Sequence, residues 1–388
     1  MVSSVLTSSL PHLRKIETVG IVIGALLSPF WFFTIGGVNL NPVDFVLIFV
    51  LAWFVLRTGL LPYSLSRQSG IAIVIFLGIV GLSILWSPNK PSGLLSFAQY
   101  LFIFVGVVPI VSYSLRDRSM RWRVFLVIWG VTTVLTLLGI YTYVSGDAQR
   151  FRDIMLWYNN QNQFFWLVAT AFLCSIALAL EESIPLGIRF VSVVLAAAEA
   201  VLIVRGMTLS AIMMVAGGVW LFGAWLAQRH AKWVRVAFAT ATVSAGILAL
   251  VAIVRYWDVI YIQGSLYARI PQYTTAIRVG VQHFPLGMGI DAYPPSVHNF
   301  VLNYFVEVGI IGAAAFLALV LIWCRDVALR SLRYPFQVQP FEFAFVAIFG
   351  TYLLVICFQP IPVQRFWWLL FGASWAVAQD RLPNIEPQ

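Results

Sequence analysis

Four polar residues stand at the start of one apolar segment of the chain: His298, Asn299, Asn303 and Glu307. The last three are four positions apart, so in a helix they share one face, with His298 at its head. An imidazole with an ordinary pKa can take a proton from a hydroxyl group near neutral pH. Polar groups in a membrane helix face a cavity or a partner. The row therefore predicts either a reaction site or a buried hydrogen-bonded network that ties helices together.

Three arginines could serve a site of this kind. Arg269 and Arg278 share one polar gap in the sequence, and Arg205 stands at the end of an earlier apolar segment. A guanidinium group stays charged and binds phosphate oxygens through paired donors, so two or three of them together would suit a diphosphate. Each arginine could instead anchor its helix by reaching lipid headgroups.

Metal chemistry has no comparable pattern in this sequence. Cys174, Cys324 and Cys357 are scattered in or at the ends of apolar segments and form neither a metal spacing nor a disulfide framework. The acidic residues show no paired spacing of the kind a metal site or a glycosidase needs. Glu199 lies within an apolar segment, where it could pair with an arginine or bind a proton. We therefore expect no metal and no cofactor.

The composition places these residues in a membrane. Hydrophobic residues make up 61% of the chain and charged residues 10%, whereas about a quarter of the residues in soluble domains are charged. A helix needs about 20 apolar residues to cross a bilayer, and such runs recur along the whole chain. The net charge of +9 is spread over short loops rather than gathered in one patch, which argues against a nucleic-acid partner.

We expect an all-α integral membrane protein with about twelve membrane-spanning helices. No linker separates two parts, so residues 1–388 form a single membrane domain. The predicted spans are residues 17–37, 43–61, 70–86, 94–113, 124–144, 163–181, 186–204, 207–228, 235–255, 298–324, 341–358 and 366–380.

The positive charges predict how these spans are oriented. With the N-terminus in the cytoplasm, Lys and Arg favour the cytoplasmic loops by about two to one, as the positive-inside rule requires. The dense basic run at 116–123 alone orients the fifth span. Both termini are then cytoplasmic, and the gap 256–297 is the largest extracytoplasmic segment.

A short amphipathic helix is expected inside the 256–297 gap, between the ninth and tenth spans. Its apolar residues recur every three or four positions, as on one narrow helical stripe: Ile270, Tyr273, Ile277, Val281 and Phe284. Arg269 marks the entrance of this helix, and Pro271 fits its first turn. A helix of this kind tends to lie in the membrane interface. The run HFPLGMG at 283–289 then predicts a stiff loop that leads to His298.

Three stretches of the sequence resemble the O-antigen ligase and polymerase superfamily, bacterial membrane glycosyltransferases of the GT-C class. Arg205 and the glycine after it resemble the family's Ser-Arg-Gly position, although Val204 stands in place of the serine. Arg269, followed by a helix and HFPLGMG, resembles the family's Arg…PLxGxG run. His298, followed by asparagine and by VEVGIIG at 306–312, resembles its HNxxL…ExGxIG run. The rest of the chain matches in hydropathy and number of spans.

The resemblance implies a GT-C-like fold with a reaction at the extracytoplasmic face of the bacterial inner membrane. A glycan would move from a polyprenyl (undecaprenyl) diphosphate carrier to an acceptor hydroxyl, with inversion and without a metal. Arg205 and Arg269 would contact the departing diphosphate, whose developing charge guanidinium groups stabilise, and His298 would assist the acceptor hydroxyl. The further substrate-binding candidates are Arg278, Asn299, Asn303 and Glu307.

Several readings stay open. A ligase would use a lipid A core sugar as the acceptor, and a polymerase would use another carrier-linked glycan. The number of spans and the place of the main outer segment favour a ligase, whereas the shortness of that segment favours a polymerase. A transporter of lipid-linked glycans could use Glu199 and Glu307 within its spans, although no pair of broken helices or inverted repeat is evident. A non-catalytic assembly subunit is the remaining possibility. In every case membrane lipids surround the chain.

Overall fold

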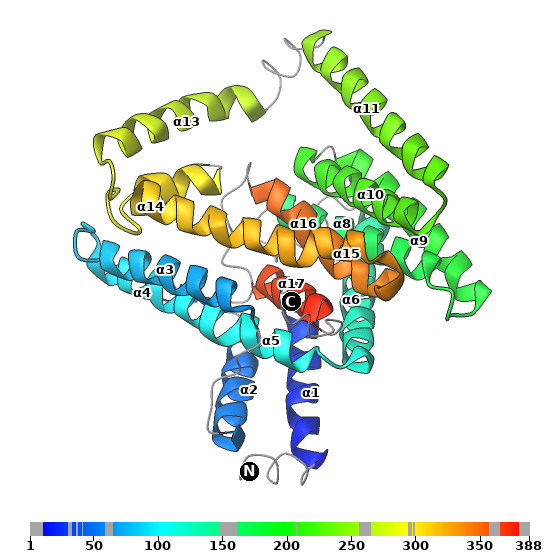
Figure 1. Ribbon diagram of the computed structural model, residues 1–388, viewed down its shortest axis with the longest axis horizontal. Helices are drawn as coiled ribbons and strands as arrows, with labels where there is room; N and C mark the ends of the chain where they lie inside the picture. The colour runs from blue at the N-terminus through cyan, green and yellow to red at the C-terminus, as the bar shows by residue number, and fades with distance from the viewer. Residues whose placement is uncertain are drawn as a thin grey trace, which may run out of the picture.

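Helices make up nearly all of the described part of the chain (Figure 1). The computed structural model describes residues 11–29, 33–35, 38–40, 42–58, 65–146, 161–206, 208–255, 265–293, 297, 299–356 and 365–379. The helices are α1 (Pro11–Leu27), α2 (Pro42–Thr58), α3 (Arg67–Ser83), α4 (Lys90–Leu101), α5 (Val108–Ser114), α6 (Arg118–Val144), α8 (Gln161–Leu180), α9 (Leu186–Gly206), α10 (Leu209–Arg229), α11 (Lys232–Arg255), α13 (Ser265–Gln282), α14 (Phe300–Trp323), α15 (Arg330–Arg333), α16 (Pro340–Ile356) and α17 (Arg365–Gln379).

Short irregular elements complete the chain. The π-helical turn η1 (Phe102–Val107) joins α4 to α5, and a second one, η2 (Cys324–Leu329), joins α14 to α15. A 3-10 turn, η3 (Pro335–Gln337), precedes α16. Strands β1 (Phe33–Ile35) and β2 (Val38–Leu40) pair antiparallel, with Phe33 opposite Leu40. The all-α expectation is therefore correct apart from this small hairpin, which lies where the first predicted span was drawn too long.

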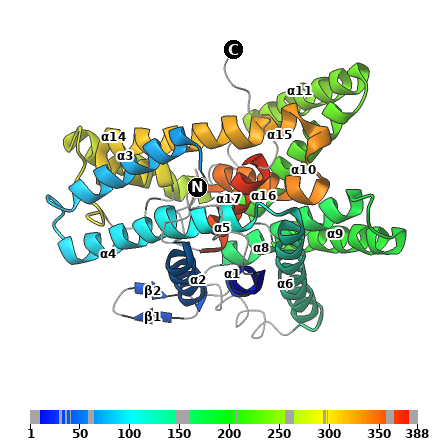
Figure 2. The same cartoon turned by 60° about the horizontal axis from the view of Figure 1, so that its bottom comes forward.

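Every predicted span coincides with a described helix, but the number that crosses a membrane is established only in part. Six segments are long and apolar enough to do so: Lys90–Ser114, Arg118–Thr142, Asn162–Leu180, Leu186–Gly206, Leu209–Arg229 and Phe300–Arg333. Helix α6 runs crosswise to α4 and α14 in both views (Figures 1 and 2). Helices that cross in this way cannot all stand along one membrane normal. The chain is a multi-pass helical membrane protein, and the count of twelve stays a prediction.

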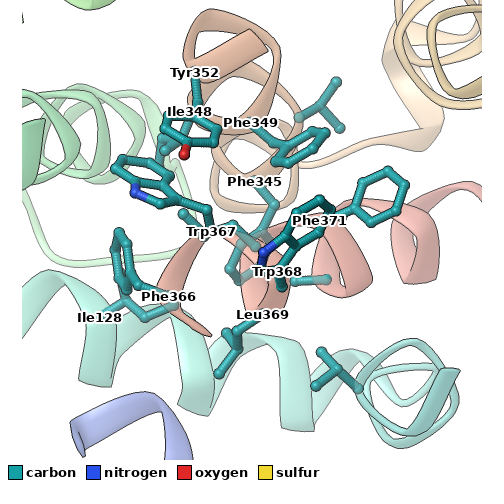
Figure 3. Close-up of a cluster of buried hydrophobic side chains, with 14 of the residues drawn as sticks. Ile128, Phe345, Ile348, Phe349, Tyr352, Phe366, Trp367, Trp368, Leu369 and Phe371 are labelled. Atoms are coloured by element: carbon teal, nitrogen blue, oxygen red, sulfur yellow. The ribbon is translucent and has the colours of Figure 1, made fainter. Parts of the chain in front are cut away.

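The tightest packing surrounds α16 and α17. Both helices are buried along nearly their whole length, as expected for helices that are apolar on every side. Tyr352 of α16 stacks on Trp367 of α17 with ring centroids 3.9 Å apart. Figure 3 shows these rings with Phe345, Phe349 and Phe371 in one aromatic cluster. The two C-terminal helices thus form the centre around which the others pack.

Ion pairs between helix ends agree with the predicted order of spans. They join Arg57 to Glu17, Arg121 to Glu342 and Arg365 to Asp44. In each pair the sequence-based topology puts both partners on the same side of the membrane. Buried charges need such partners, because an isolated charge in an apolar medium is strongly destabilising.

Candidate functional site

Helix α14 is interrupted at Gly309, and the loop before the helix supplies the hydrogen bonds that the break removes. Gly309 has φ 72° and ψ −175°, far from helical values. The carbonyl oxygen of Val306 accepts the N–H of Met288 at 2.8 Å. The carbonyl oxygen of Glu307 accepts the N–H of Gly289 at the same distance. In a regular helix these carbonyls would bond to the next turn of the same helix, so the loop and α14 form one backbone unit.

Glycine is required on both sides of this contact. Ile310 donates its N–H to the carbonyl oxygen of Pro285 at 3.1 Å, and a Cβ on Gly309 would lie 2.0 Å from that oxygen. Gly289 has φ 98°, and a Cβ there would lie 2.4 Å from the Cα of Ser87. Only glycine adopts these angles without strain. The loop is therefore wedged between the broken helix and the turn that precedes α4.

Three serines, one just before α4 and two within it, hold the far end of the loop. Ser87, just before the helix, donates its hydroxyl to the carbonyl of Ile290 at 2.8 Å. Ser92 and Ser96 donate theirs to the same carboxylate oxygen of Asp291, at 2.8 and 2.6 Å. The two serines are four residues apart, so both face the loop.

Glu307 lies on the other side of the same loop. Its side chain is buried, and the Asn303 side chain and the backbone amide of Asp291 face its carboxylate as hydrogen-bond donors. The Oδ1 atom of Asn303 is buried and accepts no hydrogen bond from any described residue. We call the group formed by these side chains the Asp291 cluster: Ser92, Ser96, Asp291, Asn303 and Glu307.

Aromatic rings close off the Asp291 cluster towards the helix bundle. The ring of Tyr304 lies between those of Tyr100 and Phe300, with centroid distances of 6.1 and 4.0 Å. Phe76 of α3 and Phe316 of α14 complete the group. The polar residues thus sit at the edge of an apolar core, where a low dielectric strengthens hydrogen bonds and charge interactions.

Helix α13 packs across the first half of α14. Ala276 and Val306 are completely buried against each other's helices. A Cβ on Gly280 would lie 2.3 Å from the ring of Phe305, so the two helices touch closely there. The predicted helix is confirmed, but it begins at Ser265. Its bounds correct two details, because Arg269 and Pro271 lie within the helix rather than at its entrance and first turn.

The predicted apolar stripe of α13 faces away from the protein. Ile270, Ile277 and Val281 are exposed, while Tyr273 is partly buried against α14. The closest contacts with α14 are made by small residues, Ala276 and Gly280, because close helix approach requires them. The exposed stripe suits the membrane interface that the sequence predicts.

The two arginines of α13 lie on different faces. Arg269 is seven residues before the buried Ala276, so at 3.6 residues per turn both lie on the face towards α14. Arg269 is partly buried there. Arg278 is two residues after Ala276, on the opposite face, and is exposed. Of the pair, Arg269 lies on the face of α13 towards α14 and Arg278 does not.

Arg205 belongs to a different part of the molecule. It is exposed in the last turn of α9, where a Cβ on the next residue, Gly206, would lie 2.0 Å from the ring of Phe165. The neighbouring Trp166 donates its Nε1–H to Ser210 of α10 at 2.9 Å. Helix α8 therefore holds the turn that presents Arg205. Within the described residues no hydrogen bond or ion pair joins Arg205 to the Asp291 cluster or to α13, and its convergence with Arg269 stays a prediction.

His298 lies outside the described residues. Its neighbour Asn299 is the N-cap of α14, and the Asn299 side-chain oxygen accepts the backbone N–H of Leu302 at 3.0 Å. This gives Asn299 a structural role that the sequence analysis did not foresee. An asparagine at this position is favoured because it satisfies an N–H that the helix start leaves unpaired.

The other chemical groups noted in the sequence lie elsewhere. Glu199 is buried in α9 and faces Thr133 of α6 and Ser175 of α8. Cys174 is buried and Cys324 partly buried, whereas Cys357 lies outside the described residues. In the described part of the chain, no three side chains of His, Cys, Asp or Glu are grouped as metal ligands.

Sequence reasoning missed the residues that face Asp291. The spacing of Ser92 and Ser96 on an apolar helix was a usable signal, because two hydroxyl groups four positions apart mark one polar face. Asp291 is one of the acidic residues for which the sequence shows no paired spacing. Neither a comparison with protein-family models nor one with curated proteins finds a match for this chain.

Proposed function

We propose that the chain is a membrane glycosyltransferase that moves a glycan from a polyprenyl diphosphate carrier to an acceptor hydroxyl. The observation that carries this proposal is the contact between the loop 283–291 and the break in α14. It brings together two of the three stretches that resemble the O-antigen ligase and polymerase superfamily. Two stretches that resemble the same superfamily and also contact each other support a function better than either stretch alone, because function depends on the site and not on the fold.

The residues near this contact suit the proposed chemistry. Arg269, on the face of α13 towards α14, would stabilise the charge that develops on the departing diphosphate. His298, immediately before the cap of α14, would orient or deprotonate the acceptor hydroxyl. Arg205 would add a second guanidinium group from the end of α9. Attack opposite the leaving group would invert the anomeric centre, and no step would require a metal.

The remaining features of the proposal concern the setting. The enzyme would span the bacterial inner membrane about twelve times in a GT-C-like fold, with both termini in the cytoplasm. The segment 256–297 would face the periplasm or cell exterior. A lipid A core acceptor makes it a ligase, and a second carrier-linked glycan makes it a polymerase.

Purified protein in detergent tests the proposal. Wild-type protein is incubated with a polyprenyl-diphosphate-linked oligosaccharide and, in separate reactions, with lipid A core or with a second carrier-linked glycan. We expect transfer that Arg269→Ala and His298→Ala each reduce at least a hundredfold. Arg123→Ala, an exposed arginine at the opposite end of the helices, is the matched control and should keep full activity. Full activity of the Arg269 and His298 variants would exclude these catalytic roles.

A transporter is the second candidate, and the break in α14 favours it. Interrupted helices near buried carboxylates bind substrates and coupling ions in many transporters, and Glu307 lies directly before such a break. In proteoliposomes, a transporter would move the lipid-linked glycan between leaflets without changing it. A glycosyltransferase would instead yield a new covalent product in detergent, where no gradient exists.

A further inference from the structure

We propose that Asp291 is a positioning residue for the transfer reaction. By accepting hydrogen bonds from Ser92 and Ser96, it fixes the half of α14 that precedes the break at Gly309 relative to α4. This inference rests on the proposed function. In that proposal Asp291 touches neither the donor nor the acceptor. It acts through the backbone contacts between its loop and α14.

One residue makes contacts in two directions here. The side chain of Asp291 accepts from Ser92 and Ser96 of α4, at 2.8 and 2.6 Å. Its backbone amide faces the carboxylate of Glu307 on α14. The residue has φ 56°, in the left-handed region, which aspartate tolerates better than most side chains. This backbone conformation lets one residue join the two helices.

The bonds to Asp291 are of a strong type. A hydroxyl that donates to a carboxylate forms a shorter and stronger bond than a neutral pair does. The described residues include no lysine or arginine in an ion pair with Asp291, so the two serines are the donors that hold it. Losing both hydroxyl groups would leave the carboxylate of Asp291 without these donors, and Ser87 would then be the remaining hydrogen-bond donor to the loop from the α4 side.

The loop has little room to move while these bonds persist. A Cβ on Gly93 of α4 would lie 2.9 Å from the side chain of Ile290, and the carbonyl of Ile290 is bonded to Ser87. On the other side, Met288 and Gly289 are bonded to α14. The loop therefore transmits the position of α4 to the part of α14 that precedes the break at Gly309, and this part begins two residues after His298 in the sequence. Displacing a catalytic group by about 1 Å can cost a hundredfold in rate.

The test is the double variant Ser92→Ala/Ser96→Ala, assayed in detergent with the polyprenyl-diphosphate donor. We expect kcat to fall at least tenfold while the KM for the donor changes less than threefold. Ser92→Thr/Ser96→Thr, which keeps both hydroxyl groups, should restore at least half of kcat. Ser119→Ala, which removes a serine–aspartate bond at the other end of the helices, is the matched control and should leave kcat unchanged.

A second control separates positioning from stability. Ser374→Ala removes the acceptor of the Trp323 indole N–H in the core and should lower the thermal unfolding midpoint without changing kcat. If Ser374→Ala, destabilised to the same extent, loses as much kcat as the double variant does, the positioning role is refuted. A kcat within twofold of wild type refutes it as well.

A labelling experiment reads the loop without any reaction. In a protein whose cysteines are replaced by alanine, Tyr293→Cys reports the accessibility of the loop to a membrane-impermeant maleimide. We expect the double serine variant to raise the labelling rate at least fivefold, and Ser119→Ala to leave it unchanged. An unchanged rate in the double variant overturns the inference. Absence of any transfer by the wild-type protein overturns the proposed function instead, so the two failures are distinct.

Discussion

Two polar groups at opposite ends of the helices, the buried Arg121 group and the partly buried Asp291 cluster, differ in how their charges are balanced. Arg121 of α6 bonds to Glu342 of α16 at 2.8 Å and also donates to two backbone carbonyls, those of Leu115 and Arg116. The second oxygen of Glu342 accepts the N–H of Gln339 at 2.9 Å. Cation and anion are both satisfied, and the group joins α6 to α16 at the end predicted to be cytoplasmic.

The Asp291 cluster has carboxylates without a matching cation. Asp291 and Glu307 are faced by hydroxyl and amide donors, and no lysine or arginine of the described residues forms an ion pair with either. The Asn303 Oδ1 atom remains without a donor in this part of the chain. A buried acceptor left open is destabilising unless something binds there. The comparison indicates that the Arg121 group serves the fold, and we propose that the Asp291 cluster serves the transfer reaction.

The largest effect should come from breaking the balanced group. Arg121→Ala removes the buried cation of Glu342 and leaves only the half-exposed Arg118, whose Nε lies 3.8 Å from the carboxylate. We expect this to lower the free energy of unfolding by about 3 kcal/mol. Denaturant titration in detergent measures this. Arg121→Met/Glu342→Leu removes both charges and should recover most of the loss; a double variant as unstable as Arg121→Ala would contradict the comparison.

The next effect concerns the break in α14. Gly309→Ala places a Cβ against the Pro285 carbonyl and forces alanine into a left-handed conformation, so we expect a loss of about 2 kcal/mol or more. Gly130→Ala in α6, where a Cβ would meet nothing within 4 Å, is the matched control. It should be neutral or stabilising by up to about 1 kcal/mol. Equal unfolding free energies for the two variants would rule out the tight contact at Gly309.

Neutralising one glutamate in each group gives the most direct test of the comparison. Glu342→Gln should cost about 3 kcal/mol, because Arg121 is left buried without its anion. Glu307→Gln should change the free energy of unfolding by about 1 kcal/mol or less, because an amide oxygen can replace the carboxylate as acceptor. Denaturant titrations of the two variants, run side by side, decide it. A greater loss for Glu307→Gln would mean that Glu307 is paired with a cation.

The smallest effect is a pH dependence at the short turn before α6. The Ser119 hydroxyl donates to Asp117 at 2.7 Å and lowers the pKa of that carboxyl below its usual value. A lowered pKa stabilises the folded state when the pH is above the pKa of the unfolded state, about 3.9. This stabilisation is lost as the pH falls through the pKa of the folded state. Thermal unfolding of wild type and Ser119→Ala should therefore differ slightly near pH 7 and converge once the pH is below the folded-state pKa of Asp117. A constant difference across this range would exclude the carboxylate as its source.

Some parts of this architecture follow from local sequence. The apolar runs predict the helices, because a segment of about 20 apolar residues has no better place than a bilayer or a buried core. The spacing after Arg269 predicts α13, and the spacing of Asn303 and Glu307 predicts their shared face. Both are properties of neighbouring residues, which helical geometry alone relates.

Other parts depend on residues far apart in the chain. The partners of Asp291 lie 195 and 199 positions away in α4, and periodicity carries no information over that distance. The stripe of α13 was assigned correctly as a helical face, but the packing of Ala276 and Gly280 on α14 decides which face is buried. The sequence of α14 likewise does not predict that the carbonyls of Val306 and Glu307 accept hydrogen bonds from the loop.

The sequence by itself therefore determined the membrane class, the order of the helices and the stiffness of the loop at 283–289. These follow from hydropathy, charge and the backbone limits of proline and glycine. Only the tertiary structure decided where α14 breaks and which carboxylate α4 holds. It also decided that Arg269, rather than Arg278, is directed towards α14. A hydrogen bond or a close backbone approach needs two segments at one point in space, and that coincidence is set by packing.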